Sequence, residues 1–269
     1  MQFDETHFRI VVFFGVLIAM IALELIFPAR QLPKEKNSPE QATRLLGNFS
    51  LLVLSNFISR IILPIGLAGL ALYTTEQQSG LFNQLNLPSW LTITLSILLL
   101  DMLIYWQHRL FHKVPLLWRL HKVHHADPHV DASTALRFHP IEIIASLAIK
   151  ATAVFVLGVP AIAVVLFEIL LNAFAIFNHA NIRLPKKIEG IARYFLMTQI
   201  LHRIHHSQLP EEANSNYGFS VIWWDKLFGS YIANASKPDR EIDIGLVEYP
   251  DAKQNAHFWG LLSMPFRKK

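Results

Sequence analysis

The sequence WLTITLSILLLDMLIYW at Trp90–Trp106 is followed without a break by QHRLFH at Gln107–His112. The first stretch is almost wholly apolar, and Asp101 is its only charged residue. A helix needs about 20 mostly apolar residues to cross a bilayer. We therefore expect a membrane-crossing helix here, and its continuation brings His108 and His112 to the membrane surface.

Four further runs are long and apolar enough to cross a membrane: Ile10–Phe27, Phe49–Tyr73, Ile141–Val159 and Ala161–Phe177. Only Pro160 separates the last two, which favours a tight helical hairpin. The whole chain is 52% hydrophobic and 16% charged, whereas a soluble domain is about 25% charged. We predict an all-α polytopic membrane bundle of about four to five transmembrane helices, with five preferred over four or six.

The residues before the first run, Met1–His7, include Asp4 and Glu5 but no Lys or Arg. A cleavable signal peptide begins with positive charge and ends in a small-residue cleavage site. We therefore expect the first apolar run to be retained as an anchor.

The charges of the loops predict the orientation, because cytoplasmic loops carry an excess of Lys and Arg. Residues 74–89 contain neither, whereas 29–48, 107–139 and the tail after Asn178 are basic. Five crossings with the N-terminus outside place all three basic segments on the cytoplasmic side, where we expect a helical cap that holds a histidine cluster. We divide the chain into N-terminal transmembrane helices and loops (1–89), a catalytic region (90–235) and a C-terminal cytoplasmic tail (236–269).

The chain has no Cys and thirteen His residues. The lack of Cys excludes disulfides, thiolate zinc sites and iron–sulfur ligation. The net charge of +4 is modest, and we predict no nucleic-acid partner. Eight of the histidines fall in three windows of five residues: HRLFH at 108–112, HKVHH at 121–125 and HRIHH at 202–206.

Residues three and four apart share a helix face, so we expect His108 and His112 to point the same way. Two facing triplets are expected as well: His121, His124 and His125, and then His202, His205 and His206. Imidazole is a common metal ligand, and eight buried imidazoles without a metal would leave ring nitrogens unpaired. A tetrahedral zinc ion takes at most four protein ligands. Eight histidines therefore favour two metal ions, although imidazole suits Zn, Cu, Fe and Ni alike.

The chain resembles the fatty acid hydroxylase / sterol desaturase superfamily over about Asp101–Tyr231. The resemblance is carried by DMLIYWQHRLFH (101–112), LWRLHKVHH (117–125), RFHPIE (137–142), NHANIRLP (178–185), HRIHHS (202–207) and NYGFSVIWWDKLFGSY (216–231). It implies an integral membrane non-haem di-iron oxygenase. Such an enzyme uses O2 and two electrons to hydroxylate or desaturate a lipid.

By this resemblance the iron ligands are the eight histidines of the three windows: His108, His112, His121, His124, His125, His202, His205 and His206. His179 is a candidate for a ninth ligand. His139 is a ligand, a residue that orients a ligand, or a helix-start residue, and the second role is preferred. We expect other side chains to orient the imidazoles by hydrogen bonds, and the candidates are Asp101, Asp127, Glu142 and Asp225. For Asp101 an ion pair with Arg60 or Lys150 is an equal alternative, and a pair between Lys150 and Glu168 is expected across the hairpin.

The chain contains no G-x-G-x-x-G nucleotide fingerprint. We therefore expect a separate reductase, ferredoxin or cytochrome to supply the electrons. The membrane is expected to be a bacterial inner membrane or the endoplasmic reticulum. Two other functions remain open. One is a membrane lipid hydrolase with a zinc-activated water, which needs fewer histidines. The other is a metal transporter, which needs ligands distributed across the membrane.

Overall fold

The computed structural model of the chain describes residues 5–31, 39–249 and 253–267. Within these ranges the chain is helical and contains no strand beyond isolated bridges. Five helical stretches there are long and apolar enough to cross a membrane: Glu5–Ile26, Gln41–Gln84, Ser89–Lys113, Pro140–Leu157 and Ala161–His179. The predicted all-α bundle with five spans is confirmed. Asp4, which entered the prediction of a retained anchor, lies outside the described residues, as do Lys34 and Lys36, which contribute to the basic charge of 29–48.

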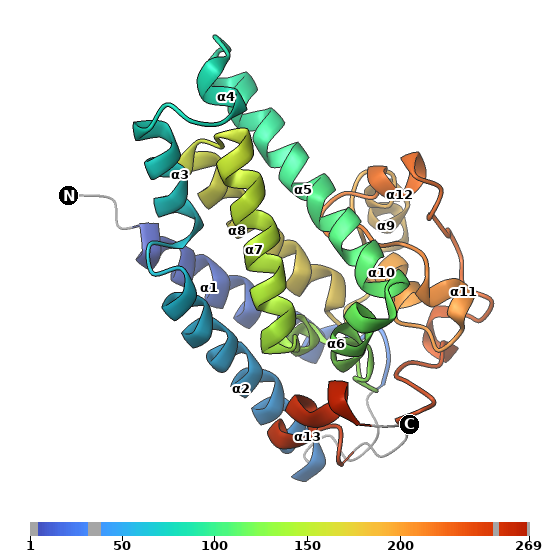
Figure 1. Cartoon of the computed structure of the whole chain (residues 1–269). Coiled ribbons are helices and arrows are strands. Elements are labelled where there is room, and N and C mark those ends of the chain that lie inside the picture. The colour runs from blue at the N-terminus through green and yellow to red at the C-terminus, as the bar shows by residue number, and fades with distance from the viewer. Residues whose placement is uncertain (1–4, 32–38, 250–252, 268–269) are drawn as a thin grey trace.

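The long helices form the bundle shown in Figure 1: α1 (Glu5–Ile26), α2 (Pro39–Ile62), α3 (Gly66–Glu76), α5 (Ser89–Lys113), α7 (Pro140–Leu157) and α8 (Ala161–His179). Helix α8 packs against α1, α3 and α5, and α7 packs against α2 and α3. The predicted second crossing is divided between α2 and α3, because Pro64 lies between them and cannot donate to a helical hydrogen bond. The short α4 (Leu81–Gln84) precedes α5.

The predicted helical hairpin is formed by α7 and α8. Gly158 ends α7 with φ of +65°, the left-handed conformation that glycine adopts without strain. A Cβ at this position would lie 2.8 Å from the backbone oxygen of Ser79. The hairpin turn therefore packs closely against the loop between α3 and α4, at one end of the bundle (Figure 1).

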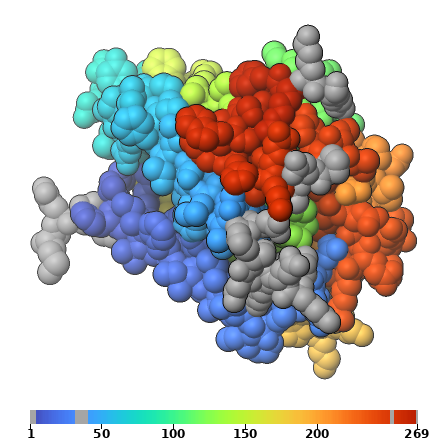
Figure 2. All heavy atoms as spheres, turned by 90° about the horizontal axis from the view of Figure 1, so that it is seen from below, coloured from blue at the N-terminus to red at the C-terminus, as the bar shows by residue number. Residues whose placement is uncertain are grey.

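The other short helices lie toward the opposite end of the bundle and beside the C-terminal half of α5 (Figure 1). They are α6 (Pro115–His125), η1 (Ala132–Leu136), α9 (Lys186–Ala192), α10 (Gln199–His205), α11 (Pro210–Ala213), α12 (Trp223–Leu227), η2 (Asp239–Glu241), α13 (Phe258–Ser263) and η3 (Met264–Phe266). Helix α6 begins at Pro115, a position in the first helical turn where proline is tolerated. Helix α13 packs against α2, and η3 packs against α6. Figure 2 shows this end, with the red C-terminal segment lying against the light-blue α2.

Glu24, the only charge within the first apolar run, ties α1 to this end of the molecule. Its Oε1 accepts hydrogen bonds from the backbone N–H groups of Ala132 and Asn181, both at 2.7 Å. Ala132 begins η1, seven residues after His125, and Asn181 follows His179, the last residue of α8, by two residues. The carboxylate thus connects α1 to two segments that follow histidines of the cluster in the sequence.

Candidate metal centre

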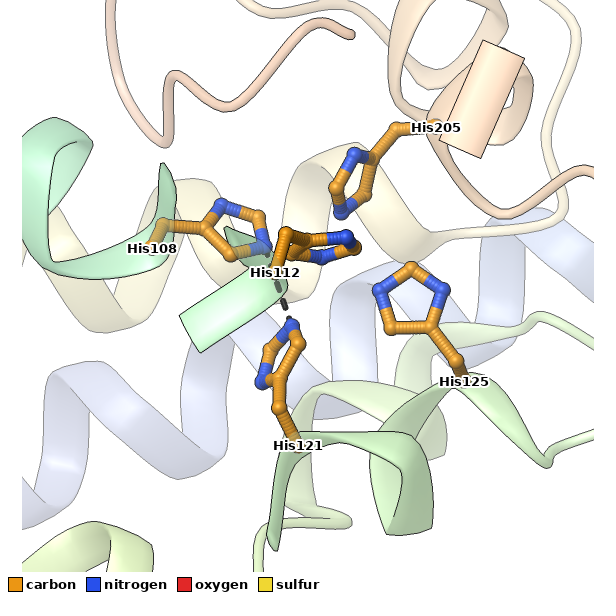
Figure 3. A group of neighbouring side chains, drawn as sticks. All are labelled: His108, His112, His121, His125 and His205. Atoms are coloured by element: carbon orange, nitrogen blue, oxygen red, sulfur yellow. Dashed lines mark hydrogen bonds between the residues drawn. The ribbon is translucent and has the colours of Figure 1, made fainter. Parts of the chain in front are cut away.

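The structure brings nine histidines together in two adjacent groups. The five-histidine group comes from α5, α6 and α10, and the four-histidine group comes from α6, α8, α10 and the residue that ends α10. Within each group, one ring nitrogen per residue lies within 4.8 Å of all the others. Figure 3 shows the five rings pointing toward a common centre. The members are His108, His112, His121, His125 and His205, and then His124, His179, His202 and His206.

The two HxxHH windows do not act as single facing triplets. His121 and His125 point into the five-histidine group, whereas His124 points into the other. Successive residues of an α-helix are separated by about 100° around its axis, so neighbouring histidines diverge. His205 and His206 are divided between the groups in the same way. Helices α6 and α10 therefore each supply both groups.

Backbone carbonyl groups hold three of the rings through their Nδ1–H groups. His108 donates to the carbonyl oxygen of Tyr217 at 2.7 Å, His205 to that of Ser215 at 2.7 Å, and His179 to that of Ala175 at 2.6 Å. A neutral imidazole that donates through Nδ1 has an unprotonated Nε2. These contacts therefore direct the Nε2 lone pairs of the three rings into the groups.

Glu142 holds a fourth ring. His121 donates from Nδ1 to Glu142 Oε1 at 2.7 Å, and both side chains are buried. A carboxylate in this position fixes the tautomer of a ligand histidine and raises its basicity. Glu142, one of the predicted orienting residues, thus touches an imidazole directly.

Asp225 acts one step further from the rings. Its carboxylate accepts hydrogen bonds from the backbone N–H groups of Tyr217 at 2.7 Å and Gly218 at 2.8 Å, and from the Ser230 hydroxyl at 2.7 Å. It therefore fixes the loop whose Tyr217 carbonyl holds His108. Burial raises the pKa of Asp225 to about 6.

Asn216 was not predicted from the sequence, although it lies between the two carbonyl groups that hold His205 and His108. Its φ is +48°, in the left-handed region that Asn adopts more readily than most residues. Its side-chain Nδ2 donates to the carbonyl oxygens of Leu201 and Ile232. The only sequence signal for this turn is an Asn in the segment after the third window.

Three other predicted orienting residues have different contacts. Asp101 accepts a hydrogen bond from Trp224 Nε1 at 2.8 Å and forms neither a contact with an imidazole nor the ion pair considered as its alternative. Asp127 is paired with Arg44 at 2.8 Å, and although burial alone would raise its pKa, Arg44 and Arg137 lower it. His139 belongs to neither group. Its Nδ1 accepts from the Ile141 backbone N–H at 3.2 Å, so it caps the start of α7.

The ring nitrogens fit a pair of bound cations. The Nδ1 atoms of His108 and His121 are both bonded to oxygen atoms, and their Nε2 atoms lie 3.1 Å apart, so that both nitrogens can face one cation. His179 Nε2 lies 2.9 Å from the Nε2 atoms of His124 and His202. Buried polar atoms without partners are costly. Six further ring nitrogens have no hydrogen-bond partner among the described residues, namely those of His112, His124, His125, His202, His205 and His206.

The protonation state favours metal binding as well. Burial lowers the pKa of His121 to about 3, because desolvation penalises the imidazolium form. Burial also lowers the pKa of His124 and His205, with a further contribution from neighbouring imidazoles. The rings outside the membrane spans are therefore neutral near pH 7. Neutral imidazole is the form that binds a metal ion.

A cavity of about 280 Å³ begins at the five-histidine group and extends among the membrane helices. His108 and His121 line one end, and Ile104, Leu147 and Leu171 are among its apolar lining residues. No member of the four-histidine group lines it. Charged residues line its other part, and there Glu168 pairs with Arg9 at 2.6 Å instead of the predicted Lys150.

Comparisons with known proteins agree with these observations. The fatty acid hydroxylase family profile matches residues 93–230. Ornithine lipid hydroxylase OlsE of Rhizobium tropici is 30% identical over 183 residues, which cover 68% of this chain and 52% of that protein. Human alkylglycerol monooxygenase is 30% identical over 161 residues, covering 58% and 34%, respectively.

A third relative is a sterol desaturase. The Delta(7)-sterol 5(6)-desaturase of Leptosphaeria maculans is 28% identical over 172 residues, covering 63% of this chain and 42% of that protein. The matched segments thus span from about a third to about half the length of these relatives. No solved structure matches the chain.

The matched region, residues 93–230, contains all nine histidines of the two groups and covers slightly more than half of the 269 residues. The chain therefore belongs to the fatty acid hydroxylase family of enzymes.

Proposed function

We propose that the chain is a membrane-bound non-haem di-iron oxygenase that hydroxylates or desaturates a lipid. One observation carries this proposal: nine histidines converge in two adjacent groups, and the five-histidine group lies at the end of a cavity that runs between membrane helices. The names of its relatives, a lipid hydroxylase, monooxygenases and a desaturase, support the same reaction class.

The donor set supports two ions of a metal that accepts many nitrogen ligands. Five imidazoles exceed the four ligands of a tetrahedral zinc site, and a catalytic zinc uses three protein ligands. A hydrolase with a single zinc-activated water would therefore leave most of the histidines unused. All nine histidines lie at one end of the bundle, whereas a transporter needs ligands along a path across it.

When bound, two iron ions would supply the activation of O2 with two electrons and two protons. In a hydroxylation one oxygen atom would enter the C–H bond and the other would leave as water, whereas in a desaturation two hydrogens would be removed and both oxygen atoms would leave as water. The chain's own residues prepare the site for that chemistry. Glu142 and the carbonyl group of Tyr217 fix the His121 and His108 rings at the mouth of the cavity. The apolar residues that line the cavity, among them Ile104, Leu147 and Leu171, would keep water from the hydrocarbon chain of a substrate and orient that chain toward these rings.

We place the histidine end on the cytoplasmic side. The loop between α3 and α5, at the other end of the bundle, contains no Lys or Arg. The segments at the histidine end include Lys113, Arg119 and Lys122, as the positive-inside rule expects of cytoplasmic loops. A separate reductase, ferredoxin or cytochrome would deliver electrons at this surface.

The test is expression with and without added iron, followed by lipid extraction and mass spectrometry. We expect a lipid whose mass is higher by one oxygen, or lower by two hydrogens, only in cells that contain the active protein and O2. His257→Ala is a matched control, because His257 is exposed and belongs to neither group. Turnover of a lipid ester or amide under anaerobic conditions with zinc would contradict the proposal.

A further inference from the structure

Three charged side chains line the cavity within the bundle, away from the histidines: Arg9 of α1, Lys150 of α7 and Glu168 of α8. Arg9 donates to Glu168 at 2.6 Å, and Lys150 lies within electrostatic reach of both. Lys150 forms no hydrogen bond or ion pair with another described residue. Two cations thus share one carboxylate, which leaves one positive charge in excess.

An excess positive charge between apolar helices needs a partner. Ionisable residues inside a membrane are costly, and they mark substrate or ion sites more often than they serve packing. The second carboxylate of the cavity, Glu142, is already bonded to His121 at the histidine end. Ser55 and Ser59 of α2 also line the cavity, and their buried hydroxyl groups have no hydrogen-bond partner among the described residues.

The spacing along the helices sets the distance between this charge and the histidines. Lys150 follows Glu142 by eight residues in α7, and Glu168 precedes His179 by eleven in α8. With a rise of 1.5 Å per residue, these separations correspond to about 12 and about 16 Å along the helix axes. In a ligand that spans the cavity, the polar group beside Lys150 therefore lies about 12–16 Å from the carbon atom that approaches the His108 and His121 rings.

We propose that Lys150, supported by the Arg9–Glu168 pair and the two serines, binds the anionic group of an amphipathic lipid whose hydrocarbon chain extends to the five-histidine group. The ligand is a carboxylate or a phosphate ester with one long chain. This inference deepens the proposed function by naming its substrate class, and it rests on that function only for the reaction, since binding needs no metal.

Binding to purified metal-free protein in detergent tests the subsite. The probes are hexadecanoate, hexadecyl phosphate, hexadecanol and hexadecylamine, which share one chain and differ in the polar group. We expect at least one of the two anions to bind more tightly than the alcohol and the amine, and which anion does so distinguishes a carboxylate from a phosphate source. Lys150→Met should weaken binding of that anion by roughly tenfold or more, because a buried charge pair is lost.

Two further variants separate the charge from general damage to the fold. Lys150→Arg should retain most of the preference for the anion, and Lys187→Met, at an exposed position on α9, should leave binding unchanged. Equal binding of the anions, the alcohol and the amine would overturn the subsite, as would unchanged anion binding in Lys150→Met. Failure of the proposed function would instead appear as absence of iron or of O2-dependent oxidation, with the binding pattern intact.

Discussion

The two histidine groups are built from the same helices but differ in their surroundings. In the five-histidine group, His108, His121 and His205 are each held by an oxygen atom on another element. In the four-histidine group, only His179 is held by an oxygen atom among the described residues, and that oxygen belongs to Ala175 of its own helix. The five-histidine group also lines the cavity, whereas the other does not.

Under the proposed function, this difference places the substrate beside the five-histidine group. The rings beside the cavity are fixed by partners outside the group, so their positions are set before a metal binds. The rings of the four-histidine group are held mainly by one another and by packing, and a bound ion would contribute more to their order. We therefore expect the two sites to differ in metal affinity and in their sensitivity to substitution.

The largest expected effect comes from removing one histidine of each group. His205→Ala and His124→Ala should each abolish turnover, because the proposed reaction needs both ions. Each should lower the iron content from about two ions to about one per chain, because the other group stays complete. Elemental analysis of purified protein, with His257→Ala as the control, checks this. Full activity or full iron content in either variant would remove that residue from the ligand set.

Glu142→Leu tests the carboxylate that holds His121. Outer-shell partners of ligand histidines are worth roughly 10–100-fold in activity or metal affinity, and we expect a loss in that range. Glu142→Gln retains an oxygen acceptor and should lose less. Steady-state turnover and iron titration of both variants provide the measurement. Equal, small effects of Leu and Gln would show that the hydrogen bond to His121 has no part in catalysis.

Asn216→Ala tests whether one turn supports two ligands of the same group. The substitution removes hydrogen bonds to Leu201 and Ile232 and places Ala at a left-handed φ, which costs about 1–2 kcal/mol. We expect weaker metal binding in the five-histidine group and little change in the other. Asn216→Gly, which accepts the backbone conformation, should be milder. Equal loss of metal from both groups would contradict the distinction between them.

A smaller, graded effect is expected from pH. The folded state keeps His121 neutral with a pKa of about 3, whereas the unfolded chain has its ordinary value of 6.5, so unfolding takes up protons as pH falls. Stability of the metal-free protein should therefore decrease below pH 6.5, by on the order of 2 kcal/mol at pH 5 from His121 alone. Thermal midpoints in detergent at pH 7.5 and 5 measure it, and His121→Gln should weaken the dependence. A midpoint that rises on acidification would be inconsistent with neutral, buried rings.

The sequence predicted the membrane helices and the gathering of the histidines, because both depend on local patterns. Apolar runs such as Trp90–Trp106 determine where the helices lie, and Pro160 marks the hairpin. The sequence analysis missed that His124 belongs to a different group from His121 and His125. His124 and His125 are separated by about 100° around the helix axis, which is enough to direct their rings into different sites. The Tyr217 and Ser215 carbonyl groups carry no side-chain signature, so no motif could reveal them.

Charged residues were the least predictable part of the site. Asp101 was expected beside an imidazole or a cation, but α12 brings the Trp224 indole to it instead. Glu168 was expected to pair with Lys150 of the adjacent helix, yet the first helix of the bundle supplies Arg9. Both outcomes depend on how elements distant in the sequence pack, which helical periodicity does not determine.

The most direct test of the central claim is the metal content of protein purified after growth with added iron, measured together with O2 consumption in the presence of lipid and a chemical reductant. We predict about two iron ions per chain, which follows from two groups with at least four imidazoles each, and lipid-dependent O2 uptake. Stoichiometric zinc with turnover that needs no O2 would contradict the account.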